Sequence, residues 1–269
     1  MAAILDRILA ATRTRVAESR RTADLRDLER RAQLHVPRGF RRALTSKGRD
    51  GIAVIAELKR ASPSKGLIRA SFEPVELARE LEHAGAACLS VLTDEEFFQG
   101  SLENLRKASA SVLIPCLRKD FIVDEFQIFE ARAYSADAVL LIVAALSQAE
   151  LVAFARSARG HGLDALCEVH DEDEFQRALD AGCDLIGVNT RDLRTFQVDL
   201  DTALRVAEKF PSGVVRVAES GIHFAQDVAR LRAAGYHAIL VGESQMRAER
   251  PGEALRALLK VPSKCRVSN

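Results

Sequence analysis

The chain has 269 residues, of which 48% are hydrophobic and 29% are charged, and its formal net charge is +1. This length suits one large domain or two small ones. The near-neutral charge gives no reason to expect nucleic acid or an anionic membrane as a partner, and no apolar run approaches the roughly 20 residues that span a bilayer.

The first 48 residues are predicted to form helices that precede the main fold. The segment MAAILDRILAATRTRV carries charges at helical spacing and lacks the apolar stretch of a signal peptide. We expect helices over residues 2–19 and 24–33, followed by a lead-in segment, HVPRGFRRAL. Because these residues are too few for a core of their own, we predict a single domain over 1–269 with 1–48 as an N-terminal helical extension.

The chain has five cysteines, an odd number without a CxxC pair, and four of them lie in or beside apolar runs. They are Cys88, Cys116, Cys167, Cys183 and Cys265. This usage is typical of reduced core thiols in a cytoplasmic protein.

From residue 51 onward, eight short apolar runs alternate with amphipathic stretches. The runs cover residues 51–58, 86–92, 112–117, 136–143, 163–169, 183–189, 214–220 and 237–243. Such alternation predicts parallel strands covered by helices, and eight units over about 200 residues predict a (β/α)8 TIM barrel, an α/β fold. A doubly wound open sheet is the rival, but the GxGxxG turn expected after its first strand is absent.

Polar residues, with glycines among them, follow six of the eight expected strands at the point where each one ends. In chain order they are Glu57, Lys59, Lys119, Glu168, Asn189, Arg191, Glu219, Ser220, Gly221, Gly242, Glu243 and Ser244. Charged groups beside apolar strands are costly to desolvate, and barrel enzymes gather their chemistry at these strand ends. One polar strand end alone is explained by an ion pair or a cap, whereas the set predicts an active site.

The last two strand ends read ESG and GES, which predicts a phosphate site. Backbone N–H groups at such turns bind phosphate in many barrels, and Ser62, Ser64 and Lys65 after the first strand are expected to lie near them. The alternative is that the glycines serve only to make tight turns.

The sequence lacks the motifs that are typical of metal sites, nucleophile elbows and P-loops. The sequence has no HExxH, Cys/His cluster, GxSxG elbow or GxxxxGK[ST] loop. The scattered His83, His161, His170 and His237 are interpreted as structural, although His170 shares a strand face with Glu168. Phe97 and Phe98 are core residues by default, and their loop position also suits an aromatic wall for a ring substrate.

Taken together, the segments IAELKRASPSKG, SVLTDEEFFQGS, IPCLRKDFIVDEFQI, ADAVLLIVAAL, GVNTRDL, VAESGI and LVGESQMR resemble the indole-3-glycerol phosphate synthases. They follow the strands in order over residues 40–250. One departure is Ser135, where the family is expected to have glycine; it concerns a helix end rather than the site.

The resemblance implies ring closure of 1-(2-carboxyphenylamino)-1-deoxyribulose 5-phosphate to indole-3-glycerol phosphate, with loss of CO2 and water and with no organic cofactor or metal. It implies Lys119 as the acid at the C2′ oxygen, and the division of the other proton transfers among Glu57, Lys59 and Glu168 stays open. The implied catalytic residues are Glu57, Lys59, Lys119, Glu168, Asn189 and Glu219. The implied substrate-binding residues are Phe98, Phe121, Arg191 and Ser220. The implied phosphate-binding residues are Lys59, Ser62, Gly221, Gly242 and, through its backbone N–H, Glu243.

Two other functions stay open. A phosphoribosylanthranilate isomerase is expected to have a Cys base at the end of the first strand, where this chain has Glu57 and Lys59. A non-catalytic barrel that binds a phosphorylated ligand is expected to lack one of the lysines or glutamates. We expect a phosphorylated small-molecule substrate and a monomer or weak oligomer, with neither nucleic acid nor membrane as a partner.

Overall fold

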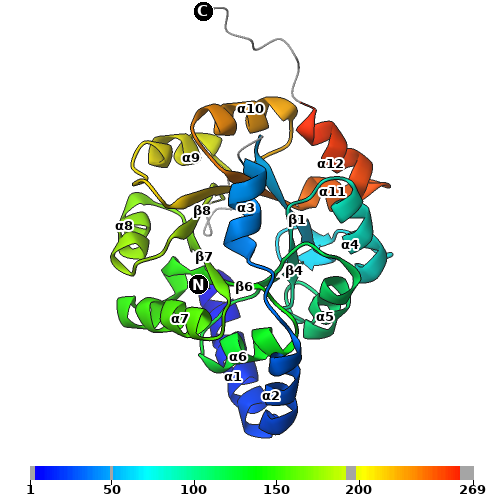
Figure 1. The fold of residues 1–269 in the computed structure, drawn as a ribbon, viewed down its shortest axis with the longest axis vertical. Helices are drawn as coiled ribbons and strands as arrows, with labels where there is room; N and C mark the ends of the chain where they lie inside the picture. The colour runs from blue at the N-terminus through cyan, green and yellow to red at the C-terminus, as the bar shows by residue number, and fades with distance from the viewer. Residues whose placement is uncertain (1–3, 49–50, 192–197, 261–269) are drawn as a thin grey trace, which may run out of the picture.

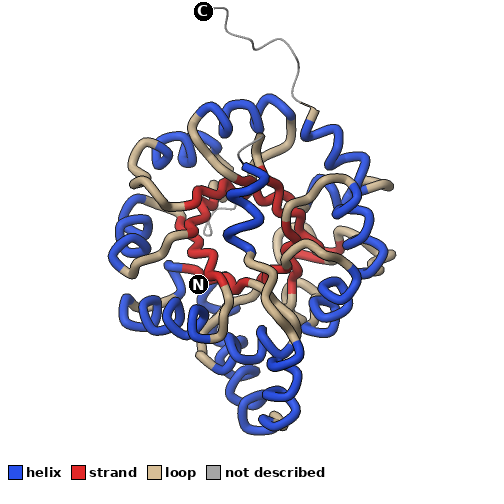
Figure 2. The backbone as a smooth tube through the Cα atoms, viewed as in Figure 1, coloured by secondary structure: helices blue, strands red, loops and turns tan. Residues whose placement is uncertain are grey.

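Eight parallel strands close into a barrel (Figure 2), in the order β1-β10-β9-β8-β7-β6-β5-β4. The computed structural model describes residues 4–48, 51–191 and 198–260, so Cys265 and residues 2–3 lie outside it. The barrel strands are β1 (Ala53–Leu58), β4 (Cys88–Leu92), β5 (Cys116–Lys119), β6 (Ala138–Ile142), β7 (Asp164–Val169), β8 (Leu185–Asn189), β9 (Val215–Glu219) and β10 (Ala238–Val241). The predicted (β/α)8 barrel is confirmed, and the doubly wound sheet is excluded.

The helices that follow the strands form a ring around them (Figure 1). They are α4 (Pro74–His83), α5 (Leu102–Ser111), α6 (Phe126–Ala133), α7 (Gln148–Gly160), α8 (Glu172–Asp180), α9 (Leu200–Ala207), α10 (Ala225–Ala233), α11 (Glu243–Arg247) and α12 (Pro251–Leu259), with the 3-10 turn η1 (Val143–Ala145) after β6. A short hairpin, β2 (Ala61–Ser62) and β3 (Gly66–Leu67), follows β1. No helix of the described residues is both long enough and apolar enough to cross a membrane.

The alternation of side chains along β1 shows how the strands position the site. Ala53 and Ile55 belong to the cluster inside the barrel, whereas Val54 and Leu58 belong to the layer beneath the helices. Successive side chains of a strand point to opposite faces, so Glu57 continues the inner face. Because β1 packs on both faces and Glu57 is its next-to-last residue, the Glu57 carboxylate is held inside the barrel at its C-terminal end.

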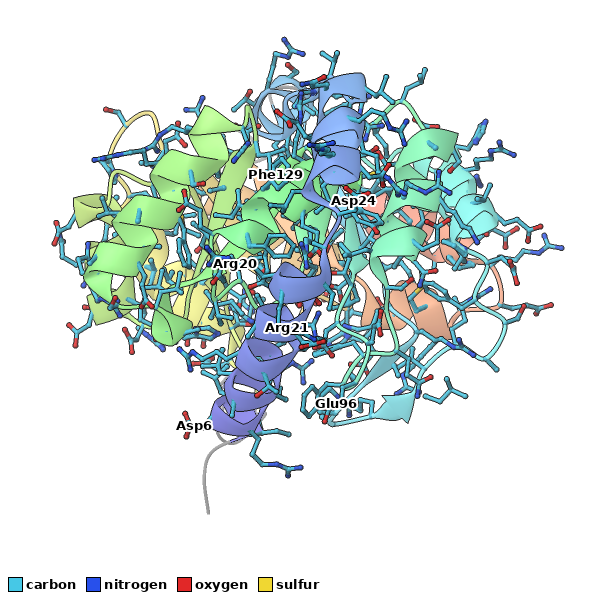
Figure 3. All side chains as sticks on the ribbon, turned by 90° about the horizontal axis from the view of Figure 1, so that it is seen from below. Asp6, Arg20, Arg21, Asp24, Glu96 and Phe129 are labelled. Carbon is cyan, nitrogen blue, oxygen red and sulfur yellow. The ribbon has the colours of Figure 1, made fainter. Side chains whose placement is uncertain are left out.

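The first two expected helices are confirmed, within three residues at each described end, as α1 (Ile4–Thr22) and α2 (Leu25–Leu34). The side chain of Asp24 caps α2 by accepting hydrogen bonds from two backbone N–H groups. Arg20 of α1 is paired with Asp124 at 3.1 Å, and α1 and α2 pack on α6. In Figure 3 the Asp6 end of α1 lies at the same end of the molecule as Glu96, which follows β4. The start of α1 therefore reaches the end of the barrel where the strands end.

The lead-in segment forms a third helix, α3 (Phe40–Gly48), which was not predicted. Figure 1 shows α3 crossing the centre of the barrel. Phe40 and Leu44 are fully buried against the apolar cluster inside the barrel. Because α3 packs beside the first residues of the strands, it closes the N-terminal end of the barrel and leaves the opposite end for the site.

We expect Ser135→Gly to raise the free energy of unfolding by about 0.5–1 kcal/mol. Ser135 follows α6 with a φ of 64°, a left-handed conformation that a β-carbon disfavours and in which glycine often ends helices. Urea unfolding of both proteins measures the change. Ser157→Gly, within α7, is the control and should lower the free energy of unfolding. An unchanged or lower midpoint for Ser135→Gly would show that the left-handed turn carries no strain.

Candidate active site

One cavity lies at the C-terminal ends of the barrel strands, and every residue to which the family resemblance gives a catalytic or binding role lines it. These residues are Glu57, Lys59, Ser62, Phe98, Lys119, Phe121, Glu168, Asn189, Arg191, Glu219, Ser220, Gly221, Gly242 and Glu243. The expectation for Lys65 was wrong, because this side chain is exposed in the β2–β3 turn and does not line the cavity. Phe97 does not line it either.

Glu57 and Lys59 form an ion pair at the end of β1, with 2.6 Å between Nζ and Oε1. Each thus offsets the cost of desolvating the other. Gly242 makes room for this pair, because a β-carbon at residue 242 would lie 2.7 Å from Cβ of Glu57. The sequence suggested a phosphate role for Gly242 and gave no sign of this contact.

Lys119 lies between two glutamates from other strands. Its Nζ donates a hydrogen bond to Oε2 of Glu168 at 2.7 Å and lies 3.5 Å from Oε2 of Glu219. Burial alone would lower the pKa of Lys119, but the carboxylates of Glu168, Glu219 and Glu57 raise it above the ordinary lysine value. The side chain is therefore a protonated ammonium at neutral pH.

The two glutamates beside Lys119 have opposite pKa shifts. Burial raises the pKa of Glu219 to about 8, and Lys119 only partly counters this. Burial acts on Glu168 in the same way, but Lys119 and His170 outweigh it and hold the pKa well below the ordinary value. Of the two glutamates beside Lys119, Glu168 is therefore ionised at neutral pH and Glu219 is mostly protonated, and such separation of neighbouring carboxyl groups is how enzymes obtain an acid and a base.

Gly187 of β8 was not singled out from the sequence, yet it decides where Glu219 lies. A β-carbon at residue 187 would lie 2.1 Å from Oε1 of Glu219. Any larger residue there would push this carboxylate from its place beside Lys119.

The cavity has an apolar wall built by two distant parts of the chain. The rings of Phe98 and Phe121 lie 6.2 Å apart, centre to centre. Ile4, Leu5 and Ile8 of α1 also line the cavity. The extension is amphipathic and leads into the strand that ends in Glu57 and Lys59, which predicts that it shapes the pocket, and the position of these three side chains agrees with that prediction.

We expect Ile8→Ala to raise KM about tenfold with little change in kcat. Ile8 is buried, and the loss of its side chain removes roughly 1.5–3 kcal/mol of apolar burial that a bound ring would share. Steady-state kinetics measure this effect. Val16→Ala is the matched control, because Val16 is equally buried on α1 but packs on α6 and not on the cavity. If both variants changed KM alike, α1 would act only on stability.

The ends of β8, β9 and β10 supply the polar groups on the other side of the cavity. Ser220 and Gly221 both have positive φ angles, 68° and 70°, and Glu243 begins α11 directly after Gly242. Oδ1 of Asn189 accepts a hydrogen bond from the backbone N–H of Arg191 at 3.1 Å, and the Arg191 guanidinium lies 3.8 Å from the Glu243 carboxylate. Among the described residues, no group of three or more His, Cys, Asp or Glu side chains is arranged to hold a metal ion.

A family model described as indole-3-glycerol phosphate synthase matches residues 5–258. The chain belongs to this family. Its similar relatives include the indole-3-glycerol phosphate synthases of Koribacter versatilis, at 59% identity over 96% of this chain and 100% of that one, and of Leptothrix cholodnii, at 49% identity over 96% and 99%. Variovorax paradoxus has another, at 48% identity over 96% of this chain and 99% of the relative.

Solved structures of low sequence identity share the barrel. A 3-hexulose-6-phosphate synthase aligns with a TM-score of 0.62 at 15% identity, over 77% of this chain and 98% of its own. A thiamine phosphate pyrophosphorylase from Pyrococcus furiosus aligns with a TM-score of 0.59 at 18% identity, over 78% and 95%. These two proteins show the fold alone, and the assignment to the synthase family rests on the relatives above.

Proposed function

We propose that the chain closes 1-(2-carboxyphenylamino)-1-deoxyribulose 5-phosphate to indole-3-glycerol phosphate, with release of CO2 and water. The observation that carries this proposal is the position of Lys119, whose ammonium lies between Glu168 and Glu219 at the cavity wall. Membership of the synthase family supports the same reaction. The cavity supplies the charged, polar and apolar groups that this substrate requires.

The first step joins the ring carbon that bears the carboxylate to the C2′ carbonyl carbon. Electrons move onto the C2′ oxygen as the bond forms, so an acid at that oxygen lowers the barrier. Lys119 is the proposed acid, because the nearby carboxylates keep it protonated. Loss of CO2 then restores the aromatic ring, and the C2′ oxygen is left as a hydroxyl.

The second step removes that hydroxyl as water and forms the indole double bond. It needs an acid at the leaving oxygen and a base for the proton on the ring side. Glu57, Lys59 and Glu168 are the proposed groups, since all three line the cavity. Glu219 is proposed to hold Lys119 in place, and Asn189 and Arg191 are proposed to orient the polar groups of the substrate.

The two ends of the substrate fit opposite sides of the cavity. We place the phosphate against the backbone N–H groups of Gly221 and Glu243, next to Gly242, with Lys59 and Ser62 beside it. Ser220 is proposed to contact the substrate nearby. The anthranilate ring is proposed to lie between Phe98, Phe121 and the apolar start of α1, because this aromatic and apolar wall suits an uncharged ring face.

A fluorescence assay of indole formation tests the function. The purified protein should convert the carboxyphenylamino substrate to a fluorescent indole product without added metal or organic cofactor. An isomerase would instead form this substrate from phosphoribosylanthranilate, and a binding protein would hold it without turnover. Either result would contradict the proposal.

We further propose that residues 1–269 form one domain, with 1–48 as its N-terminal extension. Arg38, which precedes α3, donates a 2.5 Å hydrogen bond to the buried Asp137 before β6, and Asp137 also accepts one from the backbone N–H of Cys116. This clamp, together with α3, ties the extension to the barrel. The four described cysteines are buried and free, which supports a cytoplasmic location, and we propose a monomer or weak oligomer.

A further inference from the structure

His170 lies directly after β7 and connects the active-site carboxylate Glu168 to helix α8. Its Nδ1 lies 3.0 Å from Oε2 of Glu174, the same oxygen that accepts the backbone N–H of His170 at 2.8 Å. Its Nε2 lies 3.4 Å from Oε1 of Glu168. The other oxygen of Glu168 accepts the hydrogen bond from Lys119, so this carboxylate lies between two cationic groups.

Both ring nitrogens of His170 therefore face carboxylates. A neutral imidazole has one N–H and one lone pair, and the lone pair would repel one of the two carboxylates, whereas an imidazolium donates from both nitrogens. The Nε2 atom is buried, and its contact with Glu168 lies outside hydrogen-bond geometry. A buried N–H in this position attracts Glu168 by charge and can tighten toward it when the site reacts.

We propose that His170 is a positioning residue, whose imidazolium, held by Glu174, aims the Glu168 carboxylate at Lys119 and balances its charge. The proposal rests on the reaction proposed above and assigns no contact between His170 and the substrate. Burial alone would lower the pKa of His170, but its contacts with Glu168 and Glu174 raise it to about 10. The ring is therefore a cation at the pH of the reaction.

The charge on His170 matters because few charged groups of the described part of the chain face Glu168. β6 and η1, which pack against β7, contribute only apolar residues there. Among the described residues, the titratable groups around Glu168 and His170 are Glu57 and Lys59 on β1, Lys119 on β5, Glu219 on β9 and Glu174 on α8. Glu219 is mostly protonated at neutral pH, so Lys119 and His170 are the two groups that keep Glu168 ionised.

The kinetic test uses His170→Asn and His170→Gln. Asn removes the charge and shortens the side chain, so kcat should fall about tenfold with KM changed less than about twofold. Loss of a neighbouring cation raises the pKa of a carboxylate, so the acidic limb of the kcat profile should move up by about one pH unit. The Gln variant can still present an N–H to Glu168, so it should recover part of kcat. Because it lacks the positive charge, the acidic limb of its kcat profile should stay at the higher pH.

His237→Gln is the matched control. His237 lies at the opposite, N-terminal end of the barrel and accepts a hydrogen bond from the backbone N–H of Arg216. Its replacement should lower stability without moving the pH profile. An acidic limb that stayed in place in both His170 variants, or that moved equally in the control, would overturn the proposal.

The charge on His170 can also be measured by spectroscopy in the wild-type protein. This measurement does not depend on how the variants fold or on turnover of substrate. Ring ¹⁵N resonances of the wild-type protein at pH 8 should show both nitrogens of His170 protonated. Those of His237 should show a neutral ring, since burial lowers its pKa. A neutral His170 at pH 8 would refute the proposal, whereas failure of the wild-type protein to form indole would refute the proposed function instead.

Discussion

Replacing Lys119 by Met should lower kcat by roughly 10²–10⁴-fold, the range for loss of a general acid, while KM changes much less. Met preserves the length of the side chain and removes both the charge and the proton. The C2′ oxygen would then develop negative charge without a donor, in a cavity where Glu168 and Glu219 lie within 3.5 Å of the missing ammonium. Steady-state kinetics with the carboxyphenylamino substrate measure the loss, and product affinity checks folding.

Two further substitutions sharpen this test. Lys119→Arg should not restore kcat, because a guanidinium holds its proton too firmly to deliver it. Lys107→Met, on the exposed side of α5, should leave kcat unchanged. A Lys119→Met enzyme with near-normal kcat would move the acid role to Lys59.

Replacing Glu168 by Gln should lower kcat by roughly 10²–10³-fold, within the range for loss of a positioned proton-transfer group. Gln keeps the shape of the side chain but cannot accept a proton. Glu168 is also the hydrogen-bond acceptor of Lys119 and the neighbour of His170, so its loss would leave two buried cations with less compensating charge. Part of the effect should therefore appear as lower stability.

Kinetics and urea unfolding together separate these two effects of Glu168→Gln. Glu172→Gln, at an exposed position of α8, is the control and should change neither kcat nor KM. Normal turnover by Glu168→Gln would exclude Glu168 from proton transfer and leave Glu57 as the base.

The barrel was predictable because each of its strands is an apolar run that can be recognised in the sequence. Eight apolar runs separated by helical patterns leave few other folds, and the two-residue period of a strand places Glu57 on the inner face after Ile55. Helix α3 was missed for a physical reason. Its segment is rich in arginine and glycine, and Phe40 and Leu44 are buried only because the open end of a closed barrel has to be filled.

The sequence predicts which residues form the site, but it does not predict which side chains of different strands pair with each other. Strand ends converge at one end of any barrel, so the polar residues at those ends were expected to meet. The pair of Lys119 and Glu168 joins two strands and depends on the stagger of the closed barrel, which no local pattern encodes, whereas the pair of Lys59 and Glu57 lies at the end of one strand. Lys65 was misplaced because it lies in the turn of the β2–β3 hairpin, residues 63–65, and is exposed there. Gly187 was missed because the Glu219 carboxylate that it makes room for comes from another strand.

A crystal structure of the Lys119→Met variant with the intact carboxyphenylamino substrate bound would test the proposed roles of Lys119 and the phosphate site most directly. We expect the phosphate to lie within hydrogen-bond distance of the backbone N–H groups of Gly221 or Glu243, the ring to lie against Phe98 and Phe121, and the C2′ oxygen to lie beside residue 119. A phosphate bound at the N-terminal end of the barrel, or a C2′ oxygen against Lys59 and away from residue 119, would contradict these roles.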